Sequence, residues 1–416
     1  MFKRKLKFVI KELLSEFRIV YLTGPRQAGK TTLVRQIADQ LNMDYATLDT
    51  QAVRAAAEND PHGFIFSFST NPLVLDEFQY IPELIPAIKA YSDQLEFNQK
   101  GKFLLTGSAD IFRSAKTQEA LPGHMARLEL YPLSVSEITN QSINLVDYLI
   151  KGNFSKEREI STTKNEISQW LLNGGYPEIQ SKSERGKLIW FKSYLEGRLL
   201  KDFESLYVAR GDYYSKLKAL IPYLAGLSGN LIKYSNVAND LELNDKLVRS
   251  YIEILELMFI VKRVPGYLKN TAKRGAVRMP KIHLVDTGLA CHLLGLRTVE
   301  QIQFSQYYGG LLESLIFMEF QKHAQWSDNQ SSFYHFRDKH KNEVDIVLEQ
   351  TNGDIIGIEV KASASIKTQD FRGLKKLAEF SGKKFQRGIL FYSGTDILPF
   401  HQDGNEFYAL PIGLMA

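Results

Sequence analysis

The octapeptide GPRQAGKT, at residues 24–31, constrains the fold more than any other feature because it matches the pattern G-x-x-x-x-G-K-[ST]. The β-branched and aromatic run FRIVYLT precedes it. KTTLVRQIADQLN follows, with Leu33, Ile37 and Leu41 at helical spacing. A strand, a glycine loop and a helix in this order form the setting in which the pattern holds phosphate. The sequence therefore predicts a P-loop within an α/β domain.

The residue types of this loop fit a nucleoside triphosphate. Gly24 and Gly29 permit a tight turn whose N–H groups point at phosphate oxygens, and the helix N-terminus adds positive potential. We expect Lys30 to reach the β- and γ-phosphates and the Thr31 hydroxyl to ligate Mg²⁺. The predicted ATP-binding residues are Gly24, Pro25, Arg26, Gln27, Ala28, Gly29, Lys30, Thr31, Thr32, Asp76 and Ser108.

A second motif, PLVLDEFQ, supplies two acidic groups. Leu73, Val74 and Leu75 predict a buried parallel strand, and the carboxyl end of such a strand is where α/β sheets bind ligands. Asp76 would hold Mg²⁺ through water, and Glu77 would polarise the attacking water in phosphoryl transfer. An acidic pair in this position can also be a helix cap. The P-loop upstream favours the catalytic interpretation.

Three further segments predict strands of the same sheet. KFLLTGSAD ends in Thr106 and Ser108, which could sense the γ-phosphate from an adjacent strand, and DYATLDT and ARLELYPL predict two more strands. Because strands and helices alternate, the first 140 residues indicate a parallel sheet covered by helices.

These motifs together resemble a prokaryotic AAA+ ATPase family. GPRQAGKTTL, LVLDEFQ, LLTGSAD and LELYPLSVSEI have the family's order and spacing. GGYPEI, the Lys201–Asp202 pair and MPKIHLVDTGLACHLLG resemble its poorly characterised C-terminal region. The resemblance implies an ATPase that self-associates, with Arg26 and Gln27 as part of the loop pattern. Relatives often read L-A-G-R where this chain reads LPGH, so His124 replaces that arginine. Arg127 is then the candidate for an arginine that acts in trans.

Residues 141–295 predict a helical connector. NFSKEREISTTKNE, at residues 153–166, is polar and indicates a linker. Residues 231–265 follow a helix-turn-helix-strand rhythm that resembles a winged helix. The side chains expected to face inward are Val237, Ala238 and Leu241 on the first helix and Leu247, Tyr251, Ile254 and Leu255 on the second.

The connector also offers cations to DNA. The second helix would present Asn244, Asp245, Lys246, Arg249 and Ser250 to a major groove. The following basic run contains no acidic residue and fits contact with phosphates: Lys262, Arg263, Lys269, Lys273, Arg274, Arg278 and Lys281. A solvated connector used only for subunit packing is the alternative.

The last hundred or so residues predict an α/β domain of the restriction-endonuclease-like kind. In GIEVKAS, Glu359 and Lys361 share one face of a strand. NEVDIVLE places Asp345 on a neighbouring strand, joined through a TNGD hairpin, and the helix GLLESLIFMEFQKH offers Glu313. An aspartate followed about fourteen residues later by Glu-x-Lys resembles the PD-(D/E)xK arrangement.

This arrangement predicts metal-dependent cleavage of nucleic acid. Glu313, Asp345 and Glu359 would hold Mg²⁺ or Mn²⁺, because these hard ions prefer oxygen ligands. The metal would activate water, and Lys361 would orient that water or stabilise the developing oxyanion. The alternative is an inactive member of this fold, because Glu-x-Lys is common on exposed strands.

Composition bounds the remaining possibilities. A length of 416 residues predicts more than one domain, and we place these at 1–140, 141–295 and 296–416. The formal charge of +5 is compatible with nucleic acid. No run of 18 apolar residues and no signal peptide are present in the sequence, which predicts a cytoplasmic protein without a membrane span.

Cysteine and histidine usage gives no metal site. Cys291 is the one cysteine, and its apolar helical setting predicts a buried structural thiol. The spacing of His323, His335 and His340 fits no standard zinc pattern, and we interpret them as scattered surface residues.

The sequence thus predicts a Mg-dependent AAA+ ATPase that binds or acts on DNA through its C-terminal half. The competing hypothesis is an ATP-dependent oligomeric switch or scaffold, in which an inactive nuclease-like domain binds protein or nucleic acid. A toxin–antitoxin or defence module is a third hypothesis, which describes context more than chemistry.

Overall fold

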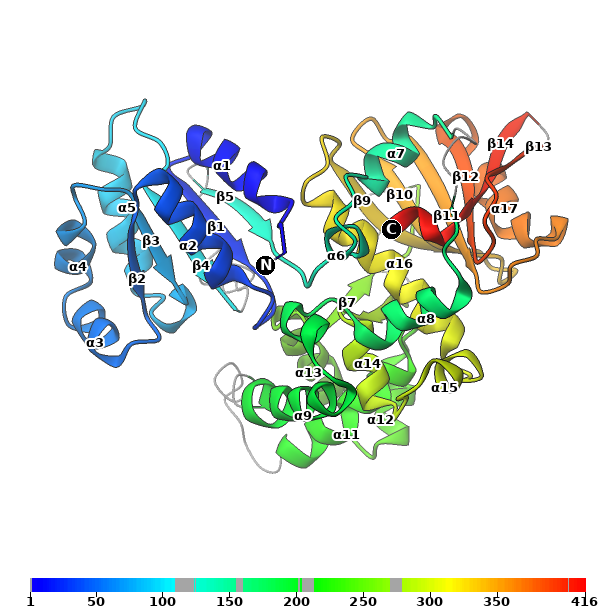
Figure 1. Cartoon of the computed structure of the whole chain (residues 1–416), viewed down its shortest axis with the longest axis horizontal. Coiled ribbons are helices and arrows are strands. Elements are labelled where there is room, and N and C mark those ends of the chain that lie inside the picture. The colour runs from blue at the N-terminus through cyan, green and yellow to red at the C-terminus, as the bar shows by residue number, and fades with distance from the viewer. Residues whose placement is uncertain are drawn as a thin grey trace. The chain divides into compact units, whose positions relative to one another are not determined.

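A computed structural model describes residues 2–108, 123, 125–154, 160–200, 203, 213–269, 279–402 and 404–416 (Figure 1). The chain divides into two compact units, Met1–Leu133 with Leu257–Phe259 and Ser134–Glu256 with Ile260–Ala416. The connector and the C-terminal sheet therefore belong to one unit, and the domain boundaries placed at residues 140 and 295 stay predictions. Several predicted residues lie outside the described ones, namely His124, Lys201, Asp202, Lys273, Arg274 and Arg278. Among the described residues, no helix has both the length and the apolar character needed to cross a bilayer.

The first unit contains the predicted parallel sheet, with strand order β2-β3-β4-β1-β5. Its strands are β1 (Ile19–Thr23), β2 (Asp44–Thr47), β3 (Leu73–Asp76), β4 (Phe103–Gly107) and β5 (Met125–Glu129). The prediction of a parallel sheet is confirmed. Because β4 pairs with both β1 and β3, the residues at the carboxyl ends of these three strands meet at one edge of the sheet.

Helices cover both faces of this sheet, as Figure 1 shows. They are α1 (Leu6–Glu16), α2 (Lys30–Leu41), α3 (Gln51–Asn59), α4 (Pro61–Ser67) and α5 (Leu84–Gln94). Side chains alternate along β1, so Tyr21 packs with residues of α5 such as Ile88, whereas Leu22 packs with residues of α2 such as Ile37. Leu33 and Ile37 are buried, whereas Leu41, which shares their helical spacing, is 42% exposed at the end of the helix.

The second unit begins with helices. These are α6 (Val135–Ile138), α7 (Leu145–Lys151), α8 (Lys164–Asn173), α9 (Glu184–Tyr194), the π-helical turn η4 (Leu195–Leu199), α11 (Tyr213–Gly226), α14 (Thr287–Leu293) and α15 (Val299–Gln303). Helix α8 starts inside the predicted linker. Thr163 and Glu166 form a reciprocal capping box there, and the T-x-x-E signature marks such a start in a sequence.

A small antiparallel sheet, in the order β6-β8-β7, accompanies two of the helices. Its elements are β6 (Asn230–Leu231), α12 (Tyr234–Asp240), α13 (Asp245–Leu257), β7 (Val261–Val264) and β8 (Lys281–Leu284). Val237, Ala238 and Tyr251 are buried as predicted. Leu247 is half-buried instead, because the inward face of α13 passes through its neighbour Val248.

The last part of the second unit is a six-stranded mixed sheet in the order β13-β14-β12-β11-β10-β9. Its strands are β9 (Ser331–Arg337), β10 (Glu343–Gln350), β11 (Ile355–Lys361), β12 (Phe385–Tyr392), β13 (Leu398–Gln402) and β14 (Asn405–Pro411). Helix α16 (Tyr308–Ala324) contacts β11, and α17 (Arg372–Ser381) shares a core with β10 and β12. Strands β10 and β11 form the predicted hairpin, whereas β11 and β12 are parallel and are joined through α17.

Two sequence motifs without an assigned role meet in the second unit. Asp286, in the segment VDTGLA, caps α14 through the Leu289 N–H at 2.9 Å and accepts the Gly175 N–H at 2.7 Å. Gly174 has φ +64°, and a Cβ at this position would lie 2.3 Å from Asp286 Oδ1. Gly174 of NGGYPEI therefore has a structural cause, which is close packing against a buried carboxylate.

Candidate functional site

The P-loop links β1 to α2 through two glycines with positive φ. Gly24 has φ +152°, and a Cβ there would lie 2.1 Å from the Leu130 carbonyl oxygen, so no larger residue fits. Gly29 precedes α2 with φ +95°, in the left-handed region that favours glycine. Both glycines of the predicted phosphate loop are thus required by the backbone.

Lys30 and Thr31, the lysine and the hydroxyl residue of the motif, are both held by hydrogen bonds within the first unit. Lys30 is 5% exposed, and its Nζ donates to the carbonyl oxygens of Gly24 and Pro25 at 2.8 Å each. Thr31 Oγ1 donates to Asp76 Oδ2 at 2.8 Å. The structure therefore brings the P-loop threonine and the β3 aspartate, predicted as a Mg²⁺ pair, within direct contact.

Strand β4 completes this edge of the sheet. The Thr106 hydroxyl donates to Asp76 Oδ1, and Thr106 Oγ1 accepts the Glu77 N–H at 3.3 Å. Glu77 has φ +59°, a conformation that costs a non-glycine residue about 1–3 kcal/mol. The chain thus leaves the extended conformation directly after Asp76, the last residue of β3.

Gln79 is a site residue that sequence reasoning missed. Its Nε2 donates to Glu77 Oε2 and to Ser108 Oγ, the latter at 2.9 Å, and its Oε1 accepts the Ser108 N–H at 3.1 Å. Ser108 was predicted to sense phosphate, and the structure places it next to this amide. The glutamine stands in the quoted motif LVLDEFQ, but only the short helix η1 (Phe78–Tyr80) that starts after Glu77 brings its side chain back to the strand ends.

Tyr45 is a second missed residue. Its hydroxyl donates to Asp76 Oδ2 at 2.7 Å, and burial, reinforced by Asp76, raises the pKa of this phenol. The Arg35 guanidinium lies 4.5 Å from the centre of the Tyr45 ring. The sequence showed DYATLDT as a strand, but only the pairing of β2 with β3 shows which carboxylate this tyrosine meets.

The other predicted residues of the first unit differ in their contacts and in their exposure. Arg26 donates to the Tyr80 hydroxyl at 2.9 Å, and the Ala28 carbonyl accepts from Arg4 at 2.9 Å. Gln27 and Thr32 are exposed. Arg127, the candidate arginine for action in trans, lies on β5 with its Nη2 3.3 Å from Glu129 Oε1.

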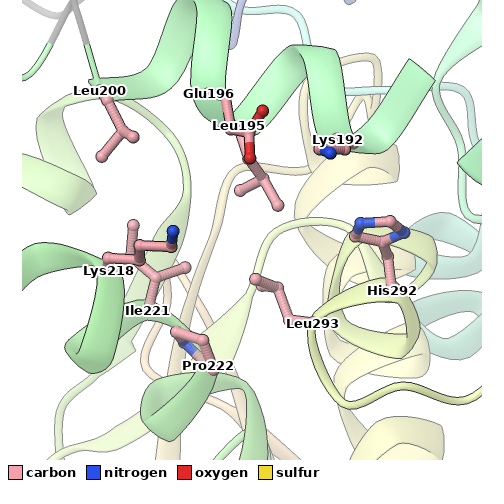
Figure 2. A pocket seen from close by; sticks show the side chains of 9 residues that line it. All are labelled: Lys192, Leu195, Glu196, Leu200, Lys218, Ile221, Pro222, His292 and Leu293. Carbon is pink, nitrogen blue, oxygen red and sulfur yellow. The ribbon is translucent and has the colours of Figure 1, made fainter. Parts of the chain in front are cut away.

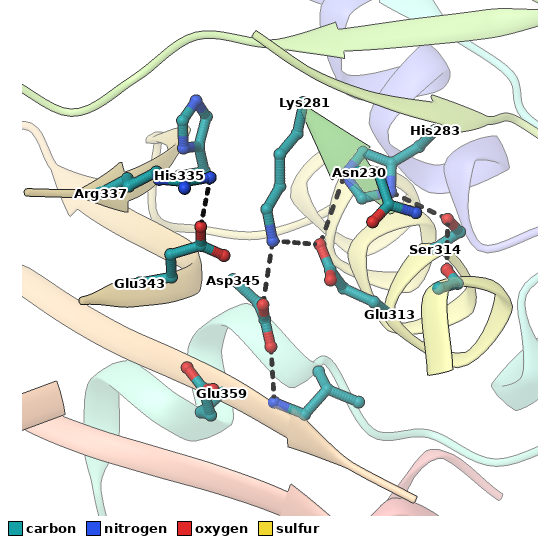
Figure 3. A network of polar contacts seen from close by, with 12 residues as sticks. Asn230, Lys281, His283, Glu313, Ser314, His335, Arg337, Glu343, Asp345 and Glu359 are labelled. Carbon is teal, nitrogen blue, oxygen red and sulfur yellow. Dashed lines mark hydrogen bonds and ion pairs between the residues drawn. The ribbon is translucent and has the colours of Figure 1, made fainter. Parts of the chain in front are cut away.

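The second predicted site, in the C-terminal unit, is organised around a lysine rather than around open carboxylates (Figure 3). Lys281 enters from β8 and is 3% exposed. Its Nζ donates to Glu313 Oε1 at 2.7 Å and to Asp345 Oδ1 at 2.9 Å. The other oxygen of Asp345 accepts the Val360 N–H at 3.0 Å. The structure thus brings Glu313 and Asp345 together, with an ammonium group between them.

Burial and charge act in opposite directions on these groups. Burial lowers the pKa of Lys281, but Asp345 and Glu313 outweigh it and hold the ammonium charged. Burial and the charge of Asp345 raise the pKa of Glu313 well above its ordinary value. Burial also raises the pKa of Asp345, but the stronger combined effect of Lys281 and the hydrogen bonds lowers it. The cluster is therefore best described as a buried Lys281 ammonium group that binds Glu313 and Asp345 together.

Glu359 and Lys361 lie beside this cluster. Lys361 Nζ is 3.5 Å from a Glu359 carboxylate oxygen, as the shared strand face predicts, and the Lys361 side chain is 38% exposed. Glu359 Oε2 has no hydrogen-bond partner among the described residues, and burial raises the pKa of this carboxyl well above its ordinary value. The described part of the chain contains no group of three His, Cys, Asp or Glu side chains placed to hold a metal ion. The predicted ligand set Glu313, Asp345 and Glu359 does not fit a metal in this arrangement.

The basic run is less available than its sequence indicated. Lys281 is buried in the cluster described above, and Arg263 is bound to Glu256 at 2.7 Å. The expectation that Lys281 contacts phosphate was therefore wrong, whereas phosphate contact by Arg263, whose side chain is 26% exposed, stays a prediction. Lys269 is exposed, with its Nζ 5.0 Å from the centre of the Phe380 ring.

Two of the three histidines expected at the surface are buried, so that expectation was wrong. His323 is fully buried, and its Nδ1 accepts the Leu145 N–H at 2.9 Å, which ties α7 to α16. His335 is 1% exposed, with its Nε2 3.1 Å from the Met279 carbonyl oxygen. The expectation for Cys291 is confirmed, because this thiol is buried.

The second unit contains a pocket of about 220 Å³ that none of the predicted site residues lines. Figure 2 shows the side chains that line it. Its wall is mainly apolar, with Leu195 and Leu200 opposite Ile221, Pro222 and Leu293. The polar lining residues are Lys192, Glu196, Lys218 and His292. Burial lowers the pKa of His292 to about 4, so this imidazole is neutral at physiological pH.

Family comparisons divide the chain into three matched segments. Residues 16–139 match a family described as an AAA domain. Residues 164–300 and 308–415 match two families described as domains of unknown function, DUF8612 and DUF4143. The segments that resemble a winged helix and a nuclease fall within these two matches.

Individual relatives are distant. Uncharacterized proteins of Mycobacterium tuberculosis and Mycobacterium bovis are each 25% identical over 357 residues, or 86% of this chain and 73% of theirs. A Walker-type ATPase of Pyrococcus abyssi is 13% identical with a TM-score of 0.45, covering 70% of this chain and 96% of its own. AMPPCP-bound DnaA of Aquifex aeolicus is 15% identical with a TM-score of 0.27, covering 60% and 85%. These scores, below 0.5, do not establish a shared arrangement. The family match, with the P-loop and the parallel sheet, makes residues 16–139 an AAA-type domain.

Proposed function

We propose that this protein binds Mg·ATP at the edge of its N-terminal sheet and hydrolyses the γ-phosphate. The observation that carries the proposal is the direct hydrogen bond between Thr31 and Asp76, which come from the P-loop and from β3. Hydroxyl and carboxylate oxygens are ligands that Mg²⁺ accepts, directly or through water. The match of residues 16–139 to an AAA domain supports the same conclusion.

The residues of this edge have distinct proposed roles. Lys30 exchanges the carbonyl oxygens of Gly24 and Pro25 for phosphate oxygens, which a charged donor in a buried loop binds more strongly. Glu77 orients and polarises the attacking water. Bound Mg²⁺ would neutralise charge on the phosphate oxygens.

Gln79 is proposed as a positioning residue for Glu77. It contacts Glu77 and Ser108 at once, so it couples the carboxylate that orients water to the end of β4. A phosphate that binds near Ser108 would shift this amide and thereby the Glu77 carboxylate. Nucleotide binding at the end of β4 would in this way change the position of Glu77, the residue proposed to orient water.

We further propose that the second unit contacts duplex DNA through α13. The order β6, α12, α13, β7, β8, with β8 between the other two strands, supports a winged-helix interpretation, in which α13 is the helix that enters the groove. Lys246 and Arg249 are exposed on this helix. Exposed Asp245 and Glu253 on the same helix offset part of their charge, so the contact is expected to be weak and salt-sensitive.

Replacing Lys246 and Arg249 by alanine is expected to weaken DNA binding uniformly across sequences and to reduce the slope of log K against log[salt] by about 1 per lost phosphate contact. Fluorescence anisotropy of a labelled duplex, titrated at several salt concentrations, measures this slope. Lys376→Ala is the matched control, because Lys376 pairs with Glu379 on α17 and is not part of the proposed face. An unchanged slope in the double variant would rule out α13 as the contact and favour a scaffold that binds protein.

Self-association is part of the proposal by resemblance to AAA+ domains. Arg127 lies on β5, the edge strand of the first sheet, where its side chain is half-buried. An arginine that acts in trans must reach a neighbour's nucleotide, and an edge position is compatible with that role. Sedimentation with and without ATP tests whether the nucleotide changes the oligomeric state.

A further inference from the structure

The carboxylates predicted to bind a metal already enclose a positive charge from their own chain. Figure 3 shows the Lys281 side chain extending from β8 between Glu313 on α16 and Asp345 on β10. Nζ lies 2.7 Å from Glu313 Oε1 and 2.9 Å from Asp345 Oδ1. These are ordinary lengths for charge-assisted hydrogen bonds. A cation bound by both oxygens would occupy the position of this ammonium group.

A metal ion could not share this position with the Lys281 ammonium group. Lys281 is 3% exposed, so its ammonium group cannot swing into water while the fold stays intact. The second oxygen of Asp345 is held by the Val360 N–H at 3.0 Å. His283 Nε2 lies 3.9 Å from Glu313 Oε1 on the other side. A divalent ion at these oxygens would face Lys281 at close range, and such a like-charge contact is costly where water is excluded.

The lysine does not come from the nuclease-like sheet. It is contributed by β8, which pairs with β6 and β7 in the small antiparallel sheet. The ion pair therefore also ties the small sheet to α16 and β10. A metal ion could satisfy the carboxylates but could not replace this connection.

We propose that Lys281 is a built-in cation that takes the place of the divalent metal at Glu313 and Asp345, so that the C-terminal sheet carries a metal-free, non-cleaving form of a nuclease-like site. The proposal does not depend on ATP hydrolysis by the first unit. It assigns to Lys281 a role in joining two sheets and leaves nucleic-acid contact, where it occurs, to other residues.

The test measures Mn²⁺ binding to the full chain in the absence of nucleotide, with electron paramagnetic resonance as the readout. All chains carry Thr31→Ala, which removes the hydroxyl proposed for the metal in the first unit. Lys281→Ala is expected to bind Mn²⁺ about tenfold or more tightly than the chain that retains Lys281. Adding Asp345→Asn to Lys281→Ala is expected to abolish that gain.

Two results would overturn the proposal. One is Mn²⁺ binding by the chain that retains Lys281, at an affinity that Asp345→Asn removes. The other is a folded Lys281→Ala chain, verified by circular dichroism, that gains no Mn²⁺ affinity. If Lys281→Ala fails to fold, Lys281→Met keeps the volume of the side chain without its charge and takes its place.

Cleavage gives an independent readout. Supercoiled plasmid incubated with the chain and Mg²⁺ or Mn²⁺ is expected to stay intact, with or without ATP. Nicking by the chain that retains Lys281, lost on Asp345→Asn, would show that a metal displaces the lysine and would contradict the proposal.

Discussion

The Glu77→Gln variant is expected to bind ATP as the unchanged protein does and to hydrolyse it about 10²–10⁴-fold more slowly. The amide keeps the shape of the carboxylate and can still accept the Gln79 hydrogen bond, so the strand ends keep their geometry. It carries no negative charge with which to polarise water. Steady-state phosphate release measures the loss, and equilibrium titration with a fluorescent ATP analogue measures binding.

Glu83→Gln is the matched control for this experiment. Glu83 is exposed and lies at the start of α5, six positions after Glu77, so the same change of chemistry there should leave turnover unaltered. Unaltered turnover in Glu77→Gln itself would assign the water-orienting role to another group at the edge of the sheet. Gln79→Ala would then be the next variant to measure.

Lys281→Ala is expected to lower the free energy of unfolding by about 3–5 kcal/mol, because it leaves buried carboxylates without their counter-charge. Urea denaturation measures the change from the midpoint and the slope. Lys361→Ala is the matched control, since Lys361 also lies beside a carboxylate but its side chain is 38% exposed. Its loss should cost about 0–1 kcal/mol.

The deficit of Lys281→Ala is also expected to depend on pH. The pKa of Asp345 is lowered in the fold, so the stability this group adds is present above its unfolded pKa and is lost as the pH falls through its folded pKa. Without Lys281 that gain disappears, and the variant should approach the unchanged protein in acid. A deficit that stays constant from neutral pH to acid would show that packing, and not charge, is what Lys281 contributes.

Local patterns made the first unit predictable. The loop GPRQAGKT and the strand before Asp76 each carry their geometry in a short segment, because glycines and apolar runs determine the backbone locally. Tyr45 and Gln79 could not be assigned in the same way. Their contacts depend on which strands are neighbours and on a strained turn at Glu77, neither of which a single segment encodes.

Burial explains the main difference in the second unit. Lys281 stands in a run of cations, and from the sequence alone such a run is expected to lie on a solvated surface. The strand β8 is central in its sheet, however, and it delivers this lysine to two acidic side chains far away in sequence. Glu313 and Asp345 do lie together as predicted. The cation between them, however, is the Lys281 ammonium group and not a metal ion.

Release of phosphate from ATP tests the central claim most directly. With Mg²⁺ present, the unchanged protein is expected to release phosphate, and chelation of the metal or Lys30→Ala is expected to abolish this release. Lys30 is the residue to change because its buried Nζ is held within the loop that the phosphates would occupy. Equal phosphate release by the unchanged protein and by Lys30→Ala, or none by either, would contradict the proposal that this edge of the sheet is an ATPase site.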